Sequence, residues 1–179
     1  SKVSMSDCVI SGQRNDTYCY NSTLVLNNCY MPDENSYGLY CVISTINMYY
    51  CAVSGGVYSL ESVITMNNSY IYSSGRRGVW STQSTLIIHN STIHGSDSGI
   101  YCDKTNAIMY NCLIYGNGYG IYCLSSELFM RKCLVSGSIY REELWSFTEE
   151  GYGVYSLSSC IIITDCHIYG TAYGLYSLG

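Results

Sequence analysis

Proline, charge and long apolar runs are all scarce in this chain. Its 179 residues include one proline, and 12% of them are Asp, Glu, Lys or Arg. The scarcity of proline favours strands, because proline cannot donate a hydrogen bond to a strand ladder. The net charge of −5 comes without a basic stripe, which argues against nucleic-acid binding. No apolar run approaches the roughly 20 residues that cross a bilayer, so we expect no membrane span.

Tyrosine and cysteine are plentiful instead, with 21 and 11 residues, and 47% of the chain is hydrophobic. That apolar content excludes global disorder. Eleven cysteines could form a disulfide framework, yet all except Cys160 fall in two repeat columns where cysteine alternates with serine. We interpret both columns as inward positions that require a small side chain. Disulfides between stacked neighbours such as Cys102 and Cys123 stay open as an alternative, because adjacent strands lie about 4.8 Å apart.

A repeat organises the whole chain, and its clearest copy is residues 100–120, IYCDKTNAIMYNCLIYGNGYG. Each copy has an aliphatic residue, an aromatic and then Cys or Ser, and a second Cys or Ser follows eleven residues after the aromatic. A fixed period of this length is typical of a solenoid. The aromatic column comprises Tyr18, Tyr40, Tyr58, Trp80, Tyr101, Tyr122, Tyr155 and Tyr176. The second column comprises Cys8, Cys29, Cys51, Ser69, Ser91, Cys112, Cys133 and Cys166.

Strand-like alternation fills the constant part of each copy and predicts inward columns, such as those of Cys102 and Met109. A Ser or Thr column that includes Thr105 suits a corner, where hydroxyls can bond to backbone left unpaired by the bend. Glycines two residues before each aromatic, such as Gly99, predict another corner that needs positive φ or close stacking. Length varies only between the second column and the next aromatic, from seven residues before Tyr58 to 22 before Tyr155. One adjustable turn per coil is therefore expected.

These features predict an all-β, right-handed parallel β-helix of about eight coils of about 21 residues. It would occupy residues 1–179 as one repeat domain, with a long inserted turn at 134–153, and would be a segment of a longer solenoid. The run NCLIYGNGYGIYC, residues 111–123, resembles the repeat of the right-handed parallel β-helix superfamily. That group includes pectate lyases, polygalacturonases and phage tailspikes, so the resemblance implies the fold and leaves the activity open.

Catalytic residues of the kind this resemblance implies are not found. Pectate-lyase-like or polygalacturonase-like catalysis implies a cluster of carboxylates, whereas Asp103 is the one acid beside the aromatic column. Glycoside hydrolysis needs two carboxylates about 5–10 Å apart. His89, His94 and His167 lack Cys or His partners at metal-ligand spacing. We therefore expect no catalytic residues, no metal and no cofactor.

The aromatic column is the most distinctive outward feature. It either stabilises strand pairing by stacking or forms a strip on which a glycan or a surface protein lies. The long turn could be functional too, or could be a flap that covers apolar surface. A second outward column becomes apolar at Ile108, Phe129 and Ile162, which predicts a contact surface. The candidate ligand-binding residues are Tyr58, Trp80, Tyr101, Tyr122, Tyr155, Arg141 and Trp145.

We expect a non-enzymatic structural or adhesive solenoid, surface or fibre-forming, that binds glycan or protein along its tyrosine ladder. The alternative is a polysaccharide lyase or glycoside hydrolase of the pectate-lyase-like superfamily. No cap is evident at either end, which predicts a longer solenoid or head-to-tail self-assembly into a filament. An extracellular, cell-surface or virion-surface location is expected. Four Asn-x-Ser/Thr sequons, at Asn15, Asn21, Asn67 and Asn90, do not decide the compartment.

Overall fold

The computed structural model describes residues 1–33, 37–75, 77–137 and 151–179, and within them the chain forms three parallel sheets and no helix. Sheet A contains β1 (Lys2–Ser6), β3 (Thr23–Asn27), β6 (Thr45–Tyr49), β9 (Val63–Asn67), β12 (Thr85–His89), β15 (Asn106–Tyr110), β18 (Glu127–Arg131) and β21 (Cys160–Thr164). Sheet B contains β4 (Tyr30–Met31), β7 (Ala52–Ser54), β10 (Tyr70–Ser73), β13 (Thr92–Gly95), β16 (Leu113–Gly116), β19 (Leu134–Gly137) and β22 (His167–Gly170). Sheet C contains β2 (Asn15–Tyr20), β5 (Tyr37–Val42), β8 (Val57–Leu60), β11 (Arg77–Thr82), β14 (Ser98–Asp103), β17 (Tyr119–Leu124), β20 (Tyr152–Leu157) and β23 (Tyr173–Leu178).

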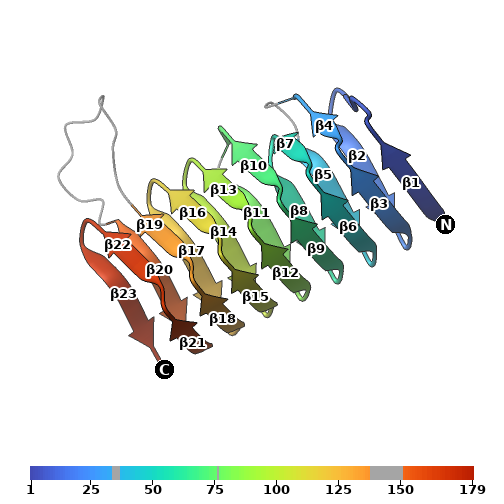
Figure 1. Ribbon diagram of the computed structural model, residues 1–179. Coiled ribbons are helices and arrows are strands. Elements are labelled where there is room, and N and C mark those ends of the chain that lie inside the picture. The colour runs from blue at the N-terminus through green and yellow to red at the C-terminus, as the bar shows by residue number, and fades with distance from the viewer. Residues whose placement is uncertain (34–36, 76, 138–150) are drawn as a thin grey trace.

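Each coil passes through sheet C, then A, then B, and the coils stack along one axis (Figure 1). The register places like residues over like: Cys102 pairs with Cys123, and Met109 pairs with Met130. This confirms the predicted β-solenoid and its repeat columns. It also follows that each coil hydrogen-bonds only to the coils before and after it, so the core grows coil by coil.

The core is the inside of the coils, where the predicted inward columns are buried. Cys102 and Met109 are both fully buried, and Ser81 fills the Cys102 column in the coil before. All eleven cysteines are free thiols. The disulfide alternative therefore does not describe this structure. A hydrogen bond that the Cys102 thiol donates to Cys123, together with burial, raises the pKa of Cys102 well above its usual value, so the thiol stays protonated as a small apolar side chain.

Two of the three corners are built alike in every coil. The corner from sheet C to A and the corner from A to B each contain two residues, such as Lys104–Thr105 and Asn111–Cys112. The first residue adopts a left-handed conformation, with φ of 50° at Lys104 and 53° at Asn111. The second residue faces inward and is Ser, Thr or Cys.

The hydroxyl column at the C-to-A corner does what the sequence predicts. Ser84 Oγ donates to the carbonyl of Thr82 at 2.7 Å and accepts from the backbone N–H of Ser62 in the preceding coil at 3.0 Å. The same pair of hydrogen bonds recurs at Ser44 and Ser126. Each hydroxyl of this column therefore hydrogen-bonds the backbone of its own corner and links it to the backbone of the preceding coil.

The glycine column at the corner from sheet B to C was expected to need either positive φ or close stacking, and in most coils it needs close stacking. Gly56 has a φ of 82°, but the glycines at the same position in the other described coils do not have positive φ. What they need is space, because a Cβ at Gly99 would lie 2.6 Å from the Tyr115 carbonyl oxygen and 2.7 Å from that of Gly120. Close stacking of backbone, and not a turn conformation, requires glycine here.

All the length variation falls at this B-to-C corner, as predicted. β7 and β8 are separated by two residues. The predicted inserted turn, residues 134–153, is too long at both ends, because residues 134–137 form β19 and β20 begins at Tyr152. Residues 138–150 of that turn, with Arg141 and Trp145, lie outside the described residues. Among the described residues, the structure has no helix that is long and apolar enough to cross a membrane.

Candidate functional site

The outward face of sheet C carries two rows of aromatic residues, which we call the tyrosine belt. The inner row is the aromatic column of the repeat. The outer row stands three residues earlier in each strand. Together the rows comprise Tyr18, Tyr40, Tyr58, Trp80, Tyr101, Tyr122, Tyr155 and Tyr176, with Tyr37, Arg77, Tyr119, Tyr152 and Tyr173 beside them.

Sequence reasoning missed the outer row because a break in the strand alternation brings it to this face. Residues three apart in a regular strand point to opposite faces. In β17, however, Gly120 and Ile121 are both buried, and Tyr119 and Tyr122 are both partly exposed. Two consecutive inward residues thus shift the alternation by one. The signal in the sequence is the motif Tyr-Gly-x-Tyr, which occurs at 37–40, 119–122, 152–155 and 173–176.

The rings of the inner row stack on one another from coil to coil. The centroids of Tyr40 and Tyr58 are 4.3 Å apart with an interplanar angle of 16°, and those of Tyr101 and Tyr122 are 5.2 Å apart at 7°. Tyr155 continues the stack at 4.9 Å from Tyr122. In the outer row, Tyr119 meets Tyr122 edge to face at 4.9 Å. The ring faces are therefore covered by other rings, and the belt presents ring edges and phenol hydroxyls outward.

The stacking also affects the ionisation of the phenols. Burial raises the pKa of Tyr122, and the neighbouring phenols of Tyr155, Tyr119 and Tyr101 raise it further. Burial and the Tyr58 phenol raise the pKa of Tyr40 as well. The hydroxyls of Tyr40 and Tyr122 therefore stay neutral, and each can donate and accept a hydrogen bond at physiological pH.

The stack of parallel rings is interrupted at Trp80. Its ring meets Tyr58 and Tyr101 at interplanar angles of 80° and 78°, and the guanidinium of Arg77 lies 4.1 Å from the Trp80 ring centroid and 3.8 Å from that of Tyr101. Contacts of this length are cation–π interactions. Arg77 Nε and Trp80 Nε1 are both buried and have no hydrogen-bond acceptor among the residues that the structure describes.

Acidic residues are sparse around the belt. Asp103 lies on its edge in β14, and its neighbours in register are Thr82 and Leu124, so no carboxylate flanks it in the adjacent strands. Two other acidic residues interact: Asp16, which stands in β2 two residues before Tyr18, and Asp33, which follows β4. Burial raises the pKa of Asp16, hydrogen bonds from the backbone of Gly12 and Asp33 lower it, and the charge of Asp33 raises it. Asp16 and Asp33 are therefore a candidate carboxylate pair, which sequence reasoning missed because Asp33 lies in the corner of variable length.

Metal ligands do not gather among the described residues: no group of three or more His, Cys, Asp or Glu could hold a metal ion there. His94 is instead stacked on Tyr72, with centroids 5.2 Å apart. Burial lowers the pKa of His94, which favours its neutral form.

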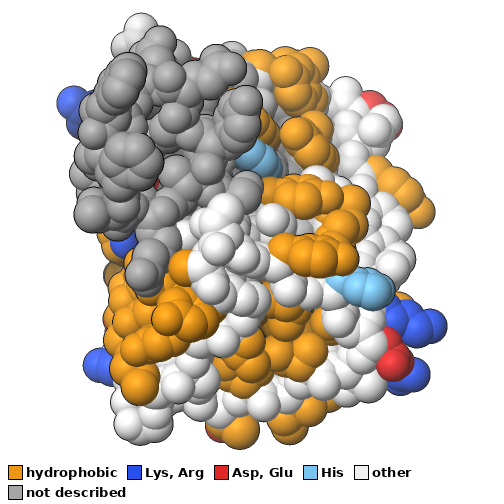
Figure 2. Space-filling view, turned by 90° about the vertical axis from the view of Figure 1, so that its left-hand side faces the viewer, with side chains coloured by type: hydrophobic (Ala, Val, Ile, Leu, Met, Phe, Trp, Pro, Cys, Tyr) orange, Lys and Arg blue, Asp and Glu red, His pale blue; other side chains and the backbone are white. Residues whose placement is uncertain are grey.

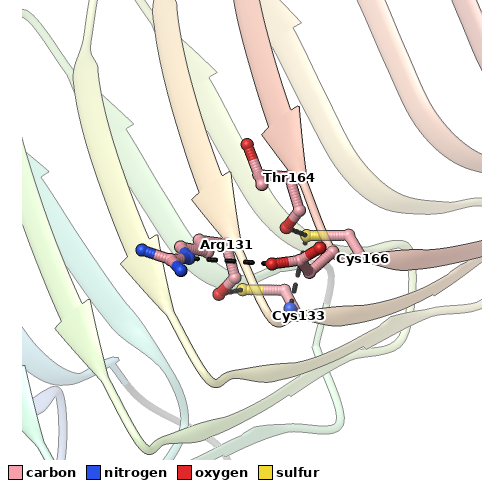
Figure 3. A network of polar contacts seen from close by, with 5 residues as sticks. Arg131, Cys133, Thr164 and Cys166 are labelled. Carbon is pink, nitrogen blue, oxygen red and sulfur yellow. Dashed lines mark hydrogen bonds and ion pairs between the residues drawn. The ribbon is translucent and has the colours of Figure 1, made fainter.

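A groove of about 450 Å³ runs along the A-to-B corner, away from the belt. Its polar side chains include Asn90, Asn111, Lys132 and His167. Asp165, also in its lining, forms an ion pair with Arg131 at 3.8 Å beside the stacked Cys133 and Cys166 (Figure 3). Both partners of the ion pair are more than half exposed, so it contributes little to stability.

The second outward column is exposed where the sequence predicted an apolar surface. Ile108, Phe129 and Ile162 are 37%, 39% and 54% exposed, and they are neighbours in register on sheet A. Figure 2 shows further exposed hydrophobic side chains on the face of the last coil. Leu175, in the last coil, is half exposed. Hydrophobic surface is thus present on two faces besides the belt.

The predicted ligand-binding residues stand as follows. Tyr58, Trp80, Tyr101, Tyr122 and Tyr155 lie in one row on one face. Arg141 and Trp145 lie outside the described residues, so their place relative to the row stays open. Arg77, Tyr119 and Tyr152 lie in the outer row of the belt, which the sequence analysis did not predict.

Comparison with known proteins agrees with this architecture. The chain is similar over 99% of its length to the A-module of the mannuronan C-5 epimerase AlgE4 from Azotobacter vinelandii, with a TM-score of 0.53 and 14% sequence identity. It spans 58% of that solved chain, and identity this low shows the fold alone. No curated protein matches it. The model of the family described as "Right handed beta helix region" matches residues 41–179, more than half of the chain. The chain therefore belongs to the right-handed β-helix family.

Proposed function

We propose that this chain is a non-enzymatic adhesive or structural β-helix that binds an elongated glycan along its tyrosine belt. The observation that carries the proposal is the row of partly exposed aromatic side chains on one face of sheet C. Each coil except that of Trp80 contributes one or two phenols, at the spacing of about 4.8 Å that separates neighbouring strands. A polymer lying parallel to the solenoid axis would meet similar chemistry at most of the coils.

The belt would bind by hydrogen bonding more than by ring stacking. Because neighbouring rings cover one another's faces, a sugar ring could not lie flat on Tyr101 or Tyr122. The hydroxyls and ring edges remain for contact. Since the rings hold each other in place, their rotamer freedom is already lost before a ligand arrives, and this preorganisation favours binding.

Hydroxyl removal tests the proposal. The triple variant Tyr101→Phe, Tyr122→Phe and Tyr155→Phe keeps the rings and their stacking but removes three phenol hydroxyls. Each lost hydrogen bond should weaken binding by about 0.5–1.5 kcal/mol, as measured by calorimetry with the oligosaccharides that a glycan array identifies. Tyr49→Phe, on sheet A outside the belt, is the matched control and should bind normally. Unchanged affinity in the triple variant would contradict the proposal.

The alternative function is a polysaccharide lyase or glycoside hydrolase. The proximity of Asp16 and Asp33, with the raised pKa of Asp16, is the observation in its favour, because paired carboxylates divide into acid and base in this way. Incubation with polyuronides and neutral glycans, scored by reducing ends and by the absorbance of unsaturated products, tests it. We expect no turnover. Turnover abolished by Asp16→Asn or Asp103→Asn would establish the enzyme.

Head-to-tail self-assembly and a surface location also stay as proposals. Parallel coils could continue from one copy to the next, since inside the solenoid each strand pairs with the equivalent strand of the neighbouring coil. Sedimentation velocity over a concentration series tests the assembly. A species whose mass stays that of one chain at every concentration would rule it out.

A further inference from the structure

Arg77 departs from the chemistry of the belt. It stands in the outer row, where other strands place Tyr37, Tyr119, Tyr152 or Tyr173. A guanidinium keeps its charge under all ordinary conditions, and it carries five N–H donors in a planar fork. The belt therefore contains one fixed positive charge amid neutral phenols.

The two rings hold this charge in a defined orientation. With its carbon 4.1 Å from the Trp80 centroid and 3.8 Å from the Tyr101 centroid, the guanidinium lies between two ring systems. Its electrostatic effect extends along the belt, because Arg77 lowers the pKa of Tyr122 against the larger effects of burial and neighbouring phenols. The side chain as a whole is only partly buried.

No described carboxylate neutralises Arg77. Among the residues that the structure describes, one ion pair is formed, and it joins Arg131 to Asp165 on another face. Arg77 is in register with Ser98, and Asp97, which directly precedes Ser98, forms no ion pair with Arg77. Asp103 lies five residues beyond Ser98 along β14, which at about 3.3 Å per residue is roughly 16 Å. Arg77 Nε and the neighbouring Trp80 Nε1 are buried and also lack acceptors among the described residues. A partly exposed guanidinium is thus left without an acceptor in the part of the chain that the structure describes.

We propose that Arg77, braced by Trp80 and Tyr101, is an oxyanion-binding site on the tyrosine belt. The planar fork suits a carboxylate or sulfate, which can accept two parallel N–H bonds. The anion could be a free ion or an acidic group carried by the glycan. The second source rests on the proposed function and would make the belt selective for a glycan that carries negative charge at this coil.

Matched ligands separate the two sources. The probes are a cello-oligosaccharide, the same oligosaccharide carboxylated at its C6 positions, and inorganic sulfate alone, each titrated by calorimetry at low and high salt. For the wild-type chain we expect at least tenfold tighter binding of the carboxylated oligosaccharide than of the neutral one. The difference should shrink at high salt, because exposed charges are screened.

Variants of the arginine provide the decisive comparison. Arg77→Gln should abolish the tenfold preference, so that the variant binds the carboxylated and the neutral oligosaccharide with the same affinity. Arg77→Lys should keep a reduced, salt-sensitive preference, because an ammonium cannot form the bidentate pair. Arg131→Gln, an exposed arginine on sheet A, should match the wild type. Thermal melts of all three variants, followed by circular dichroism, confirm that they are folded.

The outcomes distinguish this inference from the proposed function. If Arg77→Gln keeps the full preference for the carboxylated ligand, the anion site is wrong, although glycan binding stands. If no oligosaccharide binds but sulfate binds in an Arg77-dependent manner, the glycan proposal fails and the anion site holds for a free ion. If neither sulfate nor any oligosaccharide binds the wild-type chain, both proposals are wrong.

Discussion

Ile43 adopts a backbone conformation that β-branched residues normally avoid. It is the first residue of the C-to-A corner after β5, with a φ of 51°, and its side chain is 46% exposed. A left-handed conformation costs an L-residue roughly 1–2 kcal/mol, and Asn tolerates it best after Gly. Asn21 occupies the same corner one coil earlier. The strain at Ile43 is therefore not offset by burial of its side chain.

Replacing Ile43 by Asn should stabilise the chain. We expect Ile43→Asn to raise the free energy of unfolding by about 1 kcal/mol, because the strain is relieved without loss of a buried contact. Urea denaturation followed by circular dichroism measures the change. Ile43→Val keeps the β-branch and should stay within about 0.5 kcal/mol of the wild type. A lower stability for the Asn variant would show that Ile43 makes a contact that this argument neglects.

His94 should make stability depend on pH. Its pKa in the folded chain lies below the ordinary histidine value of 6.5, since burial disfavours the imidazolium. Below pH 6.5 the unfolded chain binds the proton more readily, so stability contributed by neutral His94 is present above that pH and lost as pH falls through the folded pKa. His94→Phe keeps the stack and should reduce the acid-induced fall in melting temperature between pH 7 and 5. An identical pH profile in both proteins would contradict this.

The corner between sheets C and A shows how one small side chain stabilises a whole element. Ser84 Oγ accepts from Ser62 N–H, donates to the Thr82 carbonyl and also contacts Ser59 Oγ at 3.0 Å, all inside the solenoid. Ser84 is only 7% exposed, so water does not readily replace these hydrogen bonds. A serine of this column is thus a link between coils as well as a turn residue.

Ser84→Ala should leave the Ser62 N–H buried without an acceptor. An unsatisfied buried donor costs about 1–3 kcal/mol, and we expect a loss of unfolding free energy in that range. Chemical denaturation measures it. Ser54→Ala, on the outward face of β7, is the control and should change stability by less than about 0.5 kcal/mol. Equal effects of the two substitutions would refute a special role for the corner hydroxyls.

At the scale of the whole molecule, the solenoid accepts extra length at one corner only. The C-to-A and A-to-B corners have two residues in every coil, because their hydrogen bonds join equivalent residues of consecutive coils. The B-to-C corner varies in length throughout. An insertion in the first two corners would break a stack, whereas one in the third would only lengthen a surface turn.

Inserting Gly-Ser between Ser54 and Gly55 should therefore be tolerated, with a cost of about 1 kcal/mol or less, since loop closure depends weakly on length. The same insertion between Asn68 and Ser69 interrupts the column that links Ser69 N–H to Ser91 Oγ and Cys51 N–H to Ser69 Oγ. We expect a cooperative fold from the first variant and loss of cooperativity from the second, by thermal melting. Similar melting of the two variants would contradict the assignment of the variable corner.

The sequence by itself determined the solenoid, its inward columns and the corner that carries the hydroxyl column. A repeat makes the same side chains meet their own copies, so Cys102 over Cys123 and the stacked tyrosines follow from period alone. The hydroxyl column at Thr105 and Ser126 was predictable for the same reason, because a bend leaves the same backbone groups unpaired in each coil.

Only the tertiary structure decided which residues share the belt. Alternation in a regular strand placed Tyr119 on the opposite face from Tyr122, and the two buried residues between them reversed that assignment. The position of Arg77 between two rings depends on the same local shift and on contacts between neighbouring coils. The interaction of Asp16 with Asp33 depends on the corner of variable length after β4, where no period relates Asp33 to other residues. Periodicity predicts what repeats, whereas a site built from departures from the repeat exists only once the coils are packed.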